Sequence, residues 1–345
     1  MVFSSYNKLS LFIKRHFKSL LPFLTVYKTS NILRSLYEMT TSKETCLSKP
    51  FIYRIDPCSL CNLRCPSCTS HQIATTKDRI MDLDGYKKII DNIQQYALRV
   101  SLYDKGEPLL NKAIYDMIKY TSDKRISTLI STNFNLFNQN HLPALFNSNL
   151  TILEPCLDGF TQESYEKYRK KGDVESVKNG IKMVMEHKKR IKAKWPIVDV
   201  QIVLFDHILH EIPSINKFLT ECKVDHITYR QENHGFNAEP TSIPMKSNPS
   251  TAKSNSSPSV CYWLYIGMTI EPNGDVFPCC GRGFNRFPYG NILNQSLSDI
   301  WNNKYYRFSR ALFHPGSDLE YNEEMQSIPC LNCNAFKKQR TMRCR

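Results

Sequence analysis

The sequence predicts a parallel α/β fold followed by a small cysteine-rich domain. Six strand-like segments alternate with helical ones, polar residues follow most of these strands, and a second group of cysteines begins at Cys261. Alternation of this kind is typical of a parallel sheet covered by helices. The chain has 345 residues, of which 41% are hydrophobic and 23% charged. It is therefore long enough for about two domains and too apolar for wholesale disorder.

Residues 1–48 are expected to form a basic helical extension. Their apolar side chains recur at helical spacing, at Leu9, Phe12, Ile13, Phe17, Leu20 and Leu21. We expect this helix to pack against the outside of the main domain, with binding to a membrane surface as the alternative. No apolar stretch approaches the ~18 residues that cross a bilayer. There is also no export signal, so the sequence favours a cytoplasmic protein without a transmembrane segment.

The main domain is expected to occupy residues 49–235. Its first strand lies near 51–55 and leads into a cysteine loop, after which Asp82 or Asp84 is expected to begin a helix. The further strands are expected at 98–103, 126–131, 150–157, 197–205 and 225–230. The helices between them are expected near 111–121, 139–147, 161–191 and 210–221.

Polar residues follow the ends of five of the predicted strands. They are the cysteines after the first strand, 106–108 after the second, 131–133 after the third, 158–159 after the fourth and 231–234 after the sixth. In a parallel barrel the loops at the carboxyl ends of the strands converge on one mouth, where the chemistry takes place. We therefore expect these segments to meet around one site.

The remainder of the chain is divided into a linker and a C-terminal domain. Residues 236–260 are rich in Ser and Pro and are predicted to be a linker or a surface loop. Residues 261–345 form the cysteine-rich domain, with strand-like segments at 264–270 and 275–278 around a turn that contains Gly274.

The formal net charge of +14 is concentrated in residues 1–50 and 166–194 and in the last nine residues. We interpret these basic stretches as solvated helix faces, because they lack the interleaved aromatic residues that single-strand binders use for base stacking. No nucleic-acid partner is expected, although anionic substrates or a phosphate-rich partner remain possible.

The chain contains thirteen cysteines, an odd number in a sequence without an export signal, so metal ligation is favoured over disulfides. Cys61, Cys65 and Cys68 have the spacing C-x3-C-x2-C. Three thiolates at this spacing suit three irons of a 4Fe–4S cluster and leave the fourth iron open to an outside ligand. A closed zinc site with Cys58 as the fourth ligand is the alternative.

This cysteine loop resembles the signature of the radical SAM superfamily, whose members have a partial (β/α)6 barrel. The resemblance covers roughly residues 49–235. It implies that Cys61, Cys65 and Cys68 bind the cluster and that S-adenosylmethionine (SAM) chelates the open iron. Reductive cleavage of SAM then gives a 5′-deoxyadenosyl radical, which abstracts a hydrogen atom. One departure is Ser67, where the family often has an aromatic residue.

Three further segments are similar to SAM-binding elements of this family. In Lys105-Gly106-Glu107-Pro108, Lys105 replaces a family glycine, Gly106 would let the backbone approach SAM closely, and Glu107 would suit the SAM ammonium. Ser131 and Asn133 resemble a segment that hydrogen-bonds the SAM ribose or carboxylate; Phe134 there replaces a glycine. Arg169 resembles the arginine whose guanidinium fork pairs with the SAM carboxylate.

The C-terminal domain is similar to the opening of a SPASM domain, an extension that holds auxiliary iron–sulfur clusters. Cys261, Cys279, Cys330 and Cys333 match its cysteines, but most of the later ones are missing. The resemblance therefore implies one auxiliary 4Fe–4S cluster in the shortened "twitch" form. A zinc ribbon built from the same four sulfurs is the alternative. Cys280 and Cys344 are spare candidates, whereas Cys46, Cys58, Cys156 and Cys222 are expected not to be ligands.

The expected activity is that of a radical SAM oxidoreductase acting on a small molecule, similar to dehydrogenases of aminoglycoside biosynthesis that carry one twitch cluster. A sugar or cyclitol is the favoured substrate, and a flavodoxin or ferredoxin the expected electron donor. Glu232 and His234, after the sixth strand, are candidate proton acceptors. The alternatives are a peptide- or protein-modifying maturase and, outside the enzymes, a zinc-stabilised nucleic-acid-binding protein.

Overall fold

The computed structural model describes residues 19–68, 79–231, 260–279, 287–314, 323–333 and 336. The chain divides into two units. Unit 1 comprises Met1–Ile55, Asp84–Val100 and Ser247–Arg345, and unit 2 comprises Asp56–Leu83 and Ser101–Lys246. Each unit thus combines segments that are distant in the sequence, and each holds one of the two predicted cysteine sets.

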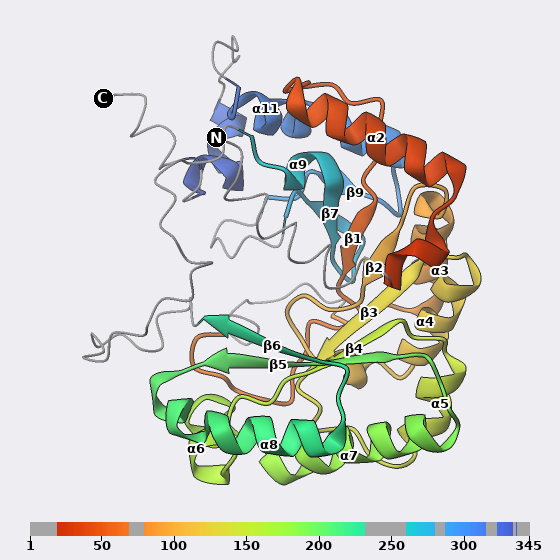
Figure 1. The fold of residues 1–345 in the computed structure, drawn as a ribbon. Helices are drawn as coiled ribbons and strands as arrows, with labels where there is room; N and C mark the ends of the chain where they lie inside the picture. The colour runs from red at the N-terminus through yellow and green to blue at the C-terminus, as the bar shows by residue number, and fades with distance from the viewer. Residues whose placement is uncertain are drawn as a thin grey trace. The chain divides into compact units, whose positions relative to one another are not determined.

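Unit 2 is a parallel α/β structure. Its strands have the order β6-β5-β4-β3, and every neighbouring pair is parallel (Figure 1). These strands are β3 Ser127–Thr132, β4 Ile152–Pro155, β5 Ile197–Leu204 and β6 His226–Gln231. The helices are α4 Ile114–Asp123, α5 His141–Asn147, α6 Gln162–Tyr168, α7 Val174–Arg190 and α8 Ile212–Cys222, with short 3-10 helices η3 Pro108–Leu110 and η4 Asp206–Glu211.

The core of unit 2 lies between the strands and these helices. Val198, Val200 and Ile202 of β5 are fully buried, as are Val177 and Ile181 of α7. The alternation along β5 puts these apolar side chains on one face, because successive residues of a strand point to opposite sides. The single helix predicted near 161–191 is two helices. Asp173 is the N-cap of the second helix, α7, and its side chain accepts a hydrogen bond from Glu175 N at 3.0 Å.

Unit 1 has the strand order β2-β1-β7-β8-β9. Strand β1 pairs with β7 in parallel, and β7, β8 and β9 pair in antiparallel. Its first elements are η1 Leu21–Phe23, α2 Val26–Thr40, β1 Ile52–Ile55, α3 Leu83–Ile93 and β2 Arg99–Ser101. The later ones are α9 Trp263–Ile266, β7 Gly267–Ile270, β8 Asp275–Phe277, β9 Gly290–Asn291, α10 Leu297–Trp301, α11 Lys304–Ala311, η6 Glu323–Ser327 and η7 Pro329–Asn332.

The six strands predicted for the main domain are β1 to β6, each at or within its predicted range to within a residue. The mixed α/β class and the parallel pairing are confirmed. The segment 264–270, predicted to be one strand, instead contains the short helix α9 followed by β7. Gly267 allows this junction because a Cβ there would lie 2.6 Å from the Trp263 indole ring.

The N-terminal segment packs against the C-terminal segment of unit 1. Helix α2 lies beside α9 (Figure 1), and Ser35 Oγ donates a hydrogen bond to Tyr265 O at 2.7 Å. The backbone N–H of Cys46 donates to Asn302 Oδ1 at 2.9 Å, and Asn302 Nδ2 donates back to Cys46 O at 2.8 Å. Helix α2 also contacts the segment predicted for the main domain, where the ring centroids of Tyr27 and Tyr96 lie 5.6 Å apart. The expected packing on the main domain is therefore confirmed in part, and it is shared with the C-terminal segment. Over the described part of the chain, no helix is long and apolar enough to cross a membrane.

Candidate metal centres

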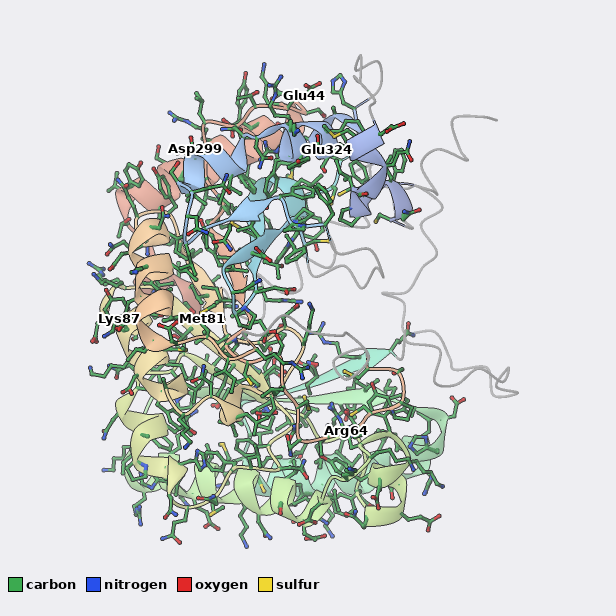
Figure 2. All side chains as sticks on the ribbon, turned by 180° about the vertical axis from the view of Figure 1, so that it is seen from behind. Glu44, Arg64, Met81, Lys87, Asp299 and Glu324 are labelled. Carbon is green, nitrogen blue, oxygen red and sulfur yellow. The ribbon has the colours of Figure 1, made fainter. Side chains whose placement is uncertain are left out.

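The first cysteine loop follows β1 and lies in unit 2, where Arg64 marks its position in Figure 2. Its backbone is held from two sides: Glu107 N donates to Leu60 O at 2.7 Å, and Arg64 N donates to Lys170 O at 3.1 Å. In addition, Asn111 Nδ2 donates to Pro57 O at 2.8 Å. The loop shape is therefore set by segments 107–111 and 170, which come from elsewhere in the same unit.

Gly106 is required by the loop itself. A Cβ at this position would lie 2.1 Å from Cys58 O and 2.3 Å from Leu60 O, closer than any side chain can approach a backbone. The close approach of the cysteine-loop backbone is thus one reason for a glycine here. The expected close approach of SAM at Gly106 stays a prediction.

The thiols of Cys61, Cys65 and Cys68 lie near one another. A turn joins the last two, with Cys68 N donating to Cys65 O at 3.1 Å. Burial raises the pKa of Cys61 to about 11, and the neighbouring Cys65 and Cys68 raise it further. Without a metal the Cys61 thiol therefore stays protonated at neutral pH. Iron that binds this thiol must displace its proton, as metals do at cysteine sites.

Hydrogen-bond donors face two of the three sulfurs. Leu63 N donates to Cys61 Sγ at 3.4 Å, and Asn133 Nδ2 donates to the same sulfur at 3.8 Å. Arg169 Nη1 donates to Cys65 Sγ at 3.9 Å. Such donors stabilise negative charge on thiolate sulfur, and hydrogen bonds to the sulfurs help to set the potential of an iron–sulfur cluster. This donor set fits a cluster held by the three thiolates.

Cys58 faces the loop's own backbone. Its side chain is fully buried, and its thiol donates to Leu60 O at 3.7 Å. Among the described residues, no three His, Cys, Asp or Glu side chains are gathered as the ligands of one metal ion. In a 4Fe–4S cluster each thiolate binds a different iron, so its sulfurs are spaced more widely than ligands of a single ion.

Glu107 binds the end of β3. Its Oε1 accepts hydrogen bonds from Thr132 Oγ1 at 2.6 Å and Leu109 N at 3.0 Å, and its Oε2 accepts one from Asn133 N at 2.8 Å. Burial raises the pKa of Glu107, and these hydrogen bonds oppose that effect. Through these hydrogen bonds Glu107 holds the end of β3 against the cysteine loop. Its expected role toward the SAM ammonium stays a prediction.

Asn133 and Phe134 form the turn after β3. Asn133 Nδ2 also donates to Asn62 Oδ1 at 2.9 Å, so its amide is aimed into the cysteine loop. Phe134 has a φ of 63°, in the left-handed region that glycine adopts most easily. Its ring stacks on Phe137 with centroids 4.3 Å apart. The backbone conformation expected of a glycine is thus kept here, with packing that offsets a strain of about 1–3 kcal/mol.

Arg169 pairs with a carboxylate of its own unit. Its Nε donates to Asp158 Oδ2 at 2.6 Å, and its Nη2 lies 2.5 Å from the same oxygen. Asp158 Oδ1 accepts a further hydrogen bond from Val203 N at 2.7 Å. From the sequence, the guanidinium fork of Arg169 is expected to bind the SAM carboxylate. In the structure Asp158 takes that edge of the fork, and Nη1 is the nitrogen turned toward Cys65.

Ser67 and Ser131 lie at the margins of this site. The Ser67 hydroxyl is 3.1 Å from the hydroxyl of Tyr168, whose ring packs on Phe205, so α6 brings an aromatic side chain to the position before the last cysteine. Ser131 Oγ lies 3.8 Å from Cys156 Sγ. The proton-acceptor candidates Glu232 and His234 fall outside the described residues.

The second cysteine set lies in unit 1. Cys261 precedes α9, Cys279 follows β8, and Cys330 and Cys333 belong to the segment of η7, where Cys333 N donates to Cys330 O at 3.2 Å. Burial raises the pKa of Cys261 to about 12, and Cys279 and Cys333 raise it further. Burial raises the pKa of Cys330 to about 12, and the neighbouring Cys261 raises it further. The structure therefore brings the four predicted cysteines together. Cys280 and Cys344 fall outside the described residues.

Aromatic side chains and a hydroxyl surround this second set. The Tyr289 hydroxyl lies 3.7 Å from Cys330 Sγ and 2.5 Å from Ser309 Oγ. The ring of Tyr306 packs edge-on against that of Tyr289, with centroids 5.0 Å apart. Neither Tyr289 nor Ser309 was expected from the sequence. No local pattern marks them, because they lie 20 to 41 residues from their partners.

Two family models match the chain. The model of the Radical SAM superfamily matches residues 55–218, and that of SPASM, an iron–sulfur cluster-binding domain, matches residues 261–334. These ranges contain the two cysteine sets, one in each.

Similar proteins are enzymes of several kinds. A probable GTP 3′,8-cyclase of Methanocaldococcus jannaschii is 28% identical over 165 residues, which are 48% of this chain and 53% of that protein. The chain thus spans about half the length of this relative. A tungsten-containing aldehyde ferredoxin oxidoreductase cofactor-modifying protein of Pyrococcus furiosus is 23% identical over 299 residues, covering 74% of this chain and 81% of that protein.

Solved structures share the fold. SuiB of Streptococcus suis superposes with a TM-score of 0.62 at 17% identity, covering 89% of this chain and 77% of that one. The protein anSMEcpe with bound AdoMet gives a TM-score of 0.54 at 17% identity, covering 85% of this chain and 99% of that one. At these identities the likeness shows the fold alone.

Proposed function

We propose that this chain, which carries a radical SAM domain followed by a SPASM domain, oxidises a small polar molecule by radical chemistry. The two domains imply a SAM-binding 4Fe–4S cluster and an auxiliary cluster. When bound, the first cluster supplies one electron that cleaves SAM to methionine and a 5′-deoxyadenosyl radical, which abstracts a hydrogen atom. A sugar or cyclitol is the proposed substrate.

The observation that carries this proposal is the contrast between Cys58 and the other three sulfurs of the loop. Cys61, Cys65 and Cys68 are mutually close, and donors face the first two of them. The thiol of Cys58 is instead directed at Leu60 O. A cluster on three thiolates keeps one iron open for the amino and carboxylate groups of SAM.

The residues around the loop have positioning roles in this proposal. Glu107 holds the end of β3 against the loop through Thr132 Oγ1 and Asn133 N. Asn133 and Arg169 then present donors to two sulfurs, which favours the reduced, more negative state of the cluster. Gly106 and Arg169 are proposed to line the SAM site, and Nη1 is the Arg169 nitrogen proposed to face SAM.

If each of the four cysteines of unit 1 bound one iron, the cluster that they would hold would have no open iron and could accept an electron. A substrate C–H bond would give its hydrogen atom to the deoxyadenosyl radical, forming 5′-deoxyadenosine. The remaining hydroxyl-bearing radical would lose its O–H proton to a base and one electron to that acceptor, which would leave a ketone. Glu232 or His234 is the proposed base. A flavodoxin or ferredoxin is the proposed reductant, in the cytoplasm.

Peptide modification is the second candidate. Structures of SuiB with its precursor peptide and of anSMEcpe with a Cp18Cys peptide are similar in fold to this chain, with TM-scores of 0.61 and 0.51. The same assay decides between the two functions, because peptides are tested beside small molecules.

The test is anaerobic reconstitution with iron and sulfide, followed by reduction with dithionite in the presence of SAM. We expect about eight irons per chain, two clusters' worth, and release of 5′-deoxyadenosine that a sugar or cyclitol accelerates. Cys58→Ala is the matched control and keeps both properties. A protein that contains only zinc and leaves SAM intact would overturn the proposal. If only peptides accelerate the release of 5′-deoxyadenosine, the result supports peptide modification instead.

A further inference from the structure

Helix α2, at the periphery of unit 1 (Figure 1), is amphipathic in the reverse of the usual sense. A surface helix normally buries its apolar side chains and exposes its polar ones. In α2, however, Val26, Leu33 and Tyr37 are 89%, 63% and 62% exposed. At about 3.6 residues per turn these three lie within about 40° of one another around the helix axis, and we call them the α2 stripe. The buried residues of the helix lie on the opposite side and are Lys28, Asn31, Ser35, Glu38 and Met39.

The buried side of α2 is fixed in unit 1 by hydrogen bonds. Asn31 Nδ2 donates to Lys49 O at 2.9 Å, and Lys49 N donates back to Asn31 Oδ1 at 2.9 Å. Glu38 Oε1 accepts a hydrogen bond from Leu47 N at 2.7 Å. Turning the helix about its axis to bury the α2 stripe would break these bonds and strand polar groups that they satisfy. The outward direction of the stripe is therefore built into the fold.

The exposed charges around the α2 stripe have one sign. Within residues 19–49, the exposed charged side chains are Arg34 and Lys43, both basic. The two acidic residues of this range are Glu38, which is buried, and Glu44, which is half-buried. Residues 1–18, which lie outside the described residues, contain four basic and no acidic side chains. The surface that carries the stripe thus combines apolar side chains with positive charge.

This combination suits the surface of an anionic bilayer better than a second copy of the chain. Anionic lipids attract each nearby Lys or Arg by about 1 kcal/mol. Aliphatic side chains such as Val26 and Leu33 can enter the boundary between head groups and acyl chains, and Tyr37 offers the apolar ring and polar tip that are typical of that interface. In a two-fold dimer the same patch of both copies would meet, which would bring their like charges together.

We propose that α2 attaches the protein to the surface of an anionic membrane, with the α2 stripe in the interface and Arg34 and Lys43 near the lipid phosphates. Attachment of this kind lies in the plane of the interface and spans nothing. The inference goes beyond the proposed function and does not depend on it, because none of these residues belongs to either cysteine set. It assigns a role to the basic N-terminal extension, which the radical chemistry does not use.

The test is cosedimentation of the full-length holoprotein with vesicles of phosphatidylglycerol, with phosphatidylcholine vesicles as the contrast without net charge. We expect tighter binding to phosphatidylglycerol, which added salt weakens by screening. Leu33→Ser should weaken this binding about tenfold, the effect of one aliphatic side chain withdrawn from an apolar environment. Arg34→Glu should weaken it about fivefold or more, since it removes one cation. Leu293→Ser, at an exposed leucine elsewhere in unit 1, keeps the affinity.

Three outcomes would overturn membrane attachment: no binding to either vesicle, equal binding to both, or an equal effect of Leu33→Ser and Leu293→Ser. Sedimentation equilibrium tests the second copy. A dimer that Leu33→Ser dissociates, without vesicle binding by the wild type, would assign the stripe to self-association instead. Far-UV circular dichroism and iron content show whether Leu33→Ser is folded, and Tyr37→Ser replaces it if it is not. Cleavage of SAM is measured separately, so failure of the radical chemistry is distinguished from failure of membrane attachment.

Discussion

The two cysteine centres differ in what surrounds their sulfurs. In unit 2, Cys61 and Cys65 face the amide of Asn133 and the guanidinium of Arg169. In unit 1, Cys330 faces the hydroxyl of Tyr289 within a layer of aromatic rings. The first set has three thiols and polar neighbours that suit a ligand-binding iron. The second has four thiols, of which that of Cys330 is buried and the others are half-buried, and four thiolates suit a cluster with no open iron. In the proposed function, the first centre binds the reactant and the second accepts the electron.

The largest expected effect comes from Cys61→Ala. It removes one of three cluster ligands, so SAM cleavage is lost and iron falls from about eight to about four per chain. Iron analysis and 5′-deoxyadenosine release measure this. Cys58→Ala serves as the matched control, and equal loss in both variants would place Cys58 among the ligands and remove the contrast.

Cys330→Ala tests the other centre. It should remove the auxiliary cluster while the first cluster still cleaves SAM, so 5′-deoxyadenosine forms but oxidised product does not. Product analysis by mass spectrometry beside the iron assay shows the separation. If Cys330→Ala abolished SAM cleavage together with product formation, the two centres would not act independently, and their proposed separate roles would be contradicted.

Gly106→Ala tests how the first loop is held. The added Cβ would lie 2.1 Å from Cys58 O, so the backbone must move. We expect a loss of about 1–3 kcal/mol, as for other overpacked sites, and a lower iron content of the first cluster. Thermal unfolding measures the loss. Gly267→Ala, in unit 1 and close to the Trp263 ring, should lower stability without affecting the first cluster.

The carboxylate of Glu211 makes the folding stability around the first cysteine loop depend on pH. Its carboxylate accepts hydrogen bonds from Phe160 N at 2.8 Å and from Ser164 Oγ at 2.5 Å, which hold the start of α6 and thereby Arg169 at its end. Burial raises its pKa, but the hydrogen bonds of Ser164, Thr161 and Phe160 lower it overall. A lowered pKa in the folded state contributes stability above the unfolded value of ~4.3, and this stability is lost as pH falls through the folded pKa.

Glu211→Gln should therefore destabilise the protein at neutral pH by about 1–2 kcal/mol, the cost of weakened hydrogen bonds to a charged group. Below about pH 4 the difference from wild type should narrow. Denaturant unfolding at several pH values measures it, with Glu166→Gln, exposed on α6, as the control. A constant difference at every pH would contradict the assignment.

The smallest effect is expected for Tyr289→Phe. It removes the hydroxyl near Cys330 Sγ and should lower the potential of the auxiliary cluster by about 40 mV, one hydrogen bond of ~1 kcal/mol in a one-electron couple. An anaerobic redox titration followed by electron paramagnetic resonance reads it. Tyr305→Phe, whose hydroxyl instead bonds Glu324, is the control. Equal potentials in Tyr289→Phe and wild type would show that the hydroxyl does not act on the cluster.

The order of elements and the grouping of cysteines could be predicted from the sequence because both depend on local pattern. The spacing of apolar residues identified β1 to β6, and cysteines separated by two or three intervening residues can meet within one loop. The four cysteines of unit 1 were grouped through a family resemblance and not through geometry. The split between α6 and α7 was missed because Gly172 and Asp173 lie inside an otherwise continuous amphipathic pattern.

The sequence by itself thus determined which residue types gather and in what order along the chain. Only the tertiary structure decided their partners: Gly106 meets the loop backbone, Arg169 meets Asp158, and the N-terminal helix meets α9. The physical reason is that a hydrogen bond or a close contact depends on positions within about 3 Å. Strand register and packing fix such positions between segments that lie tens to hundreds of residues apart.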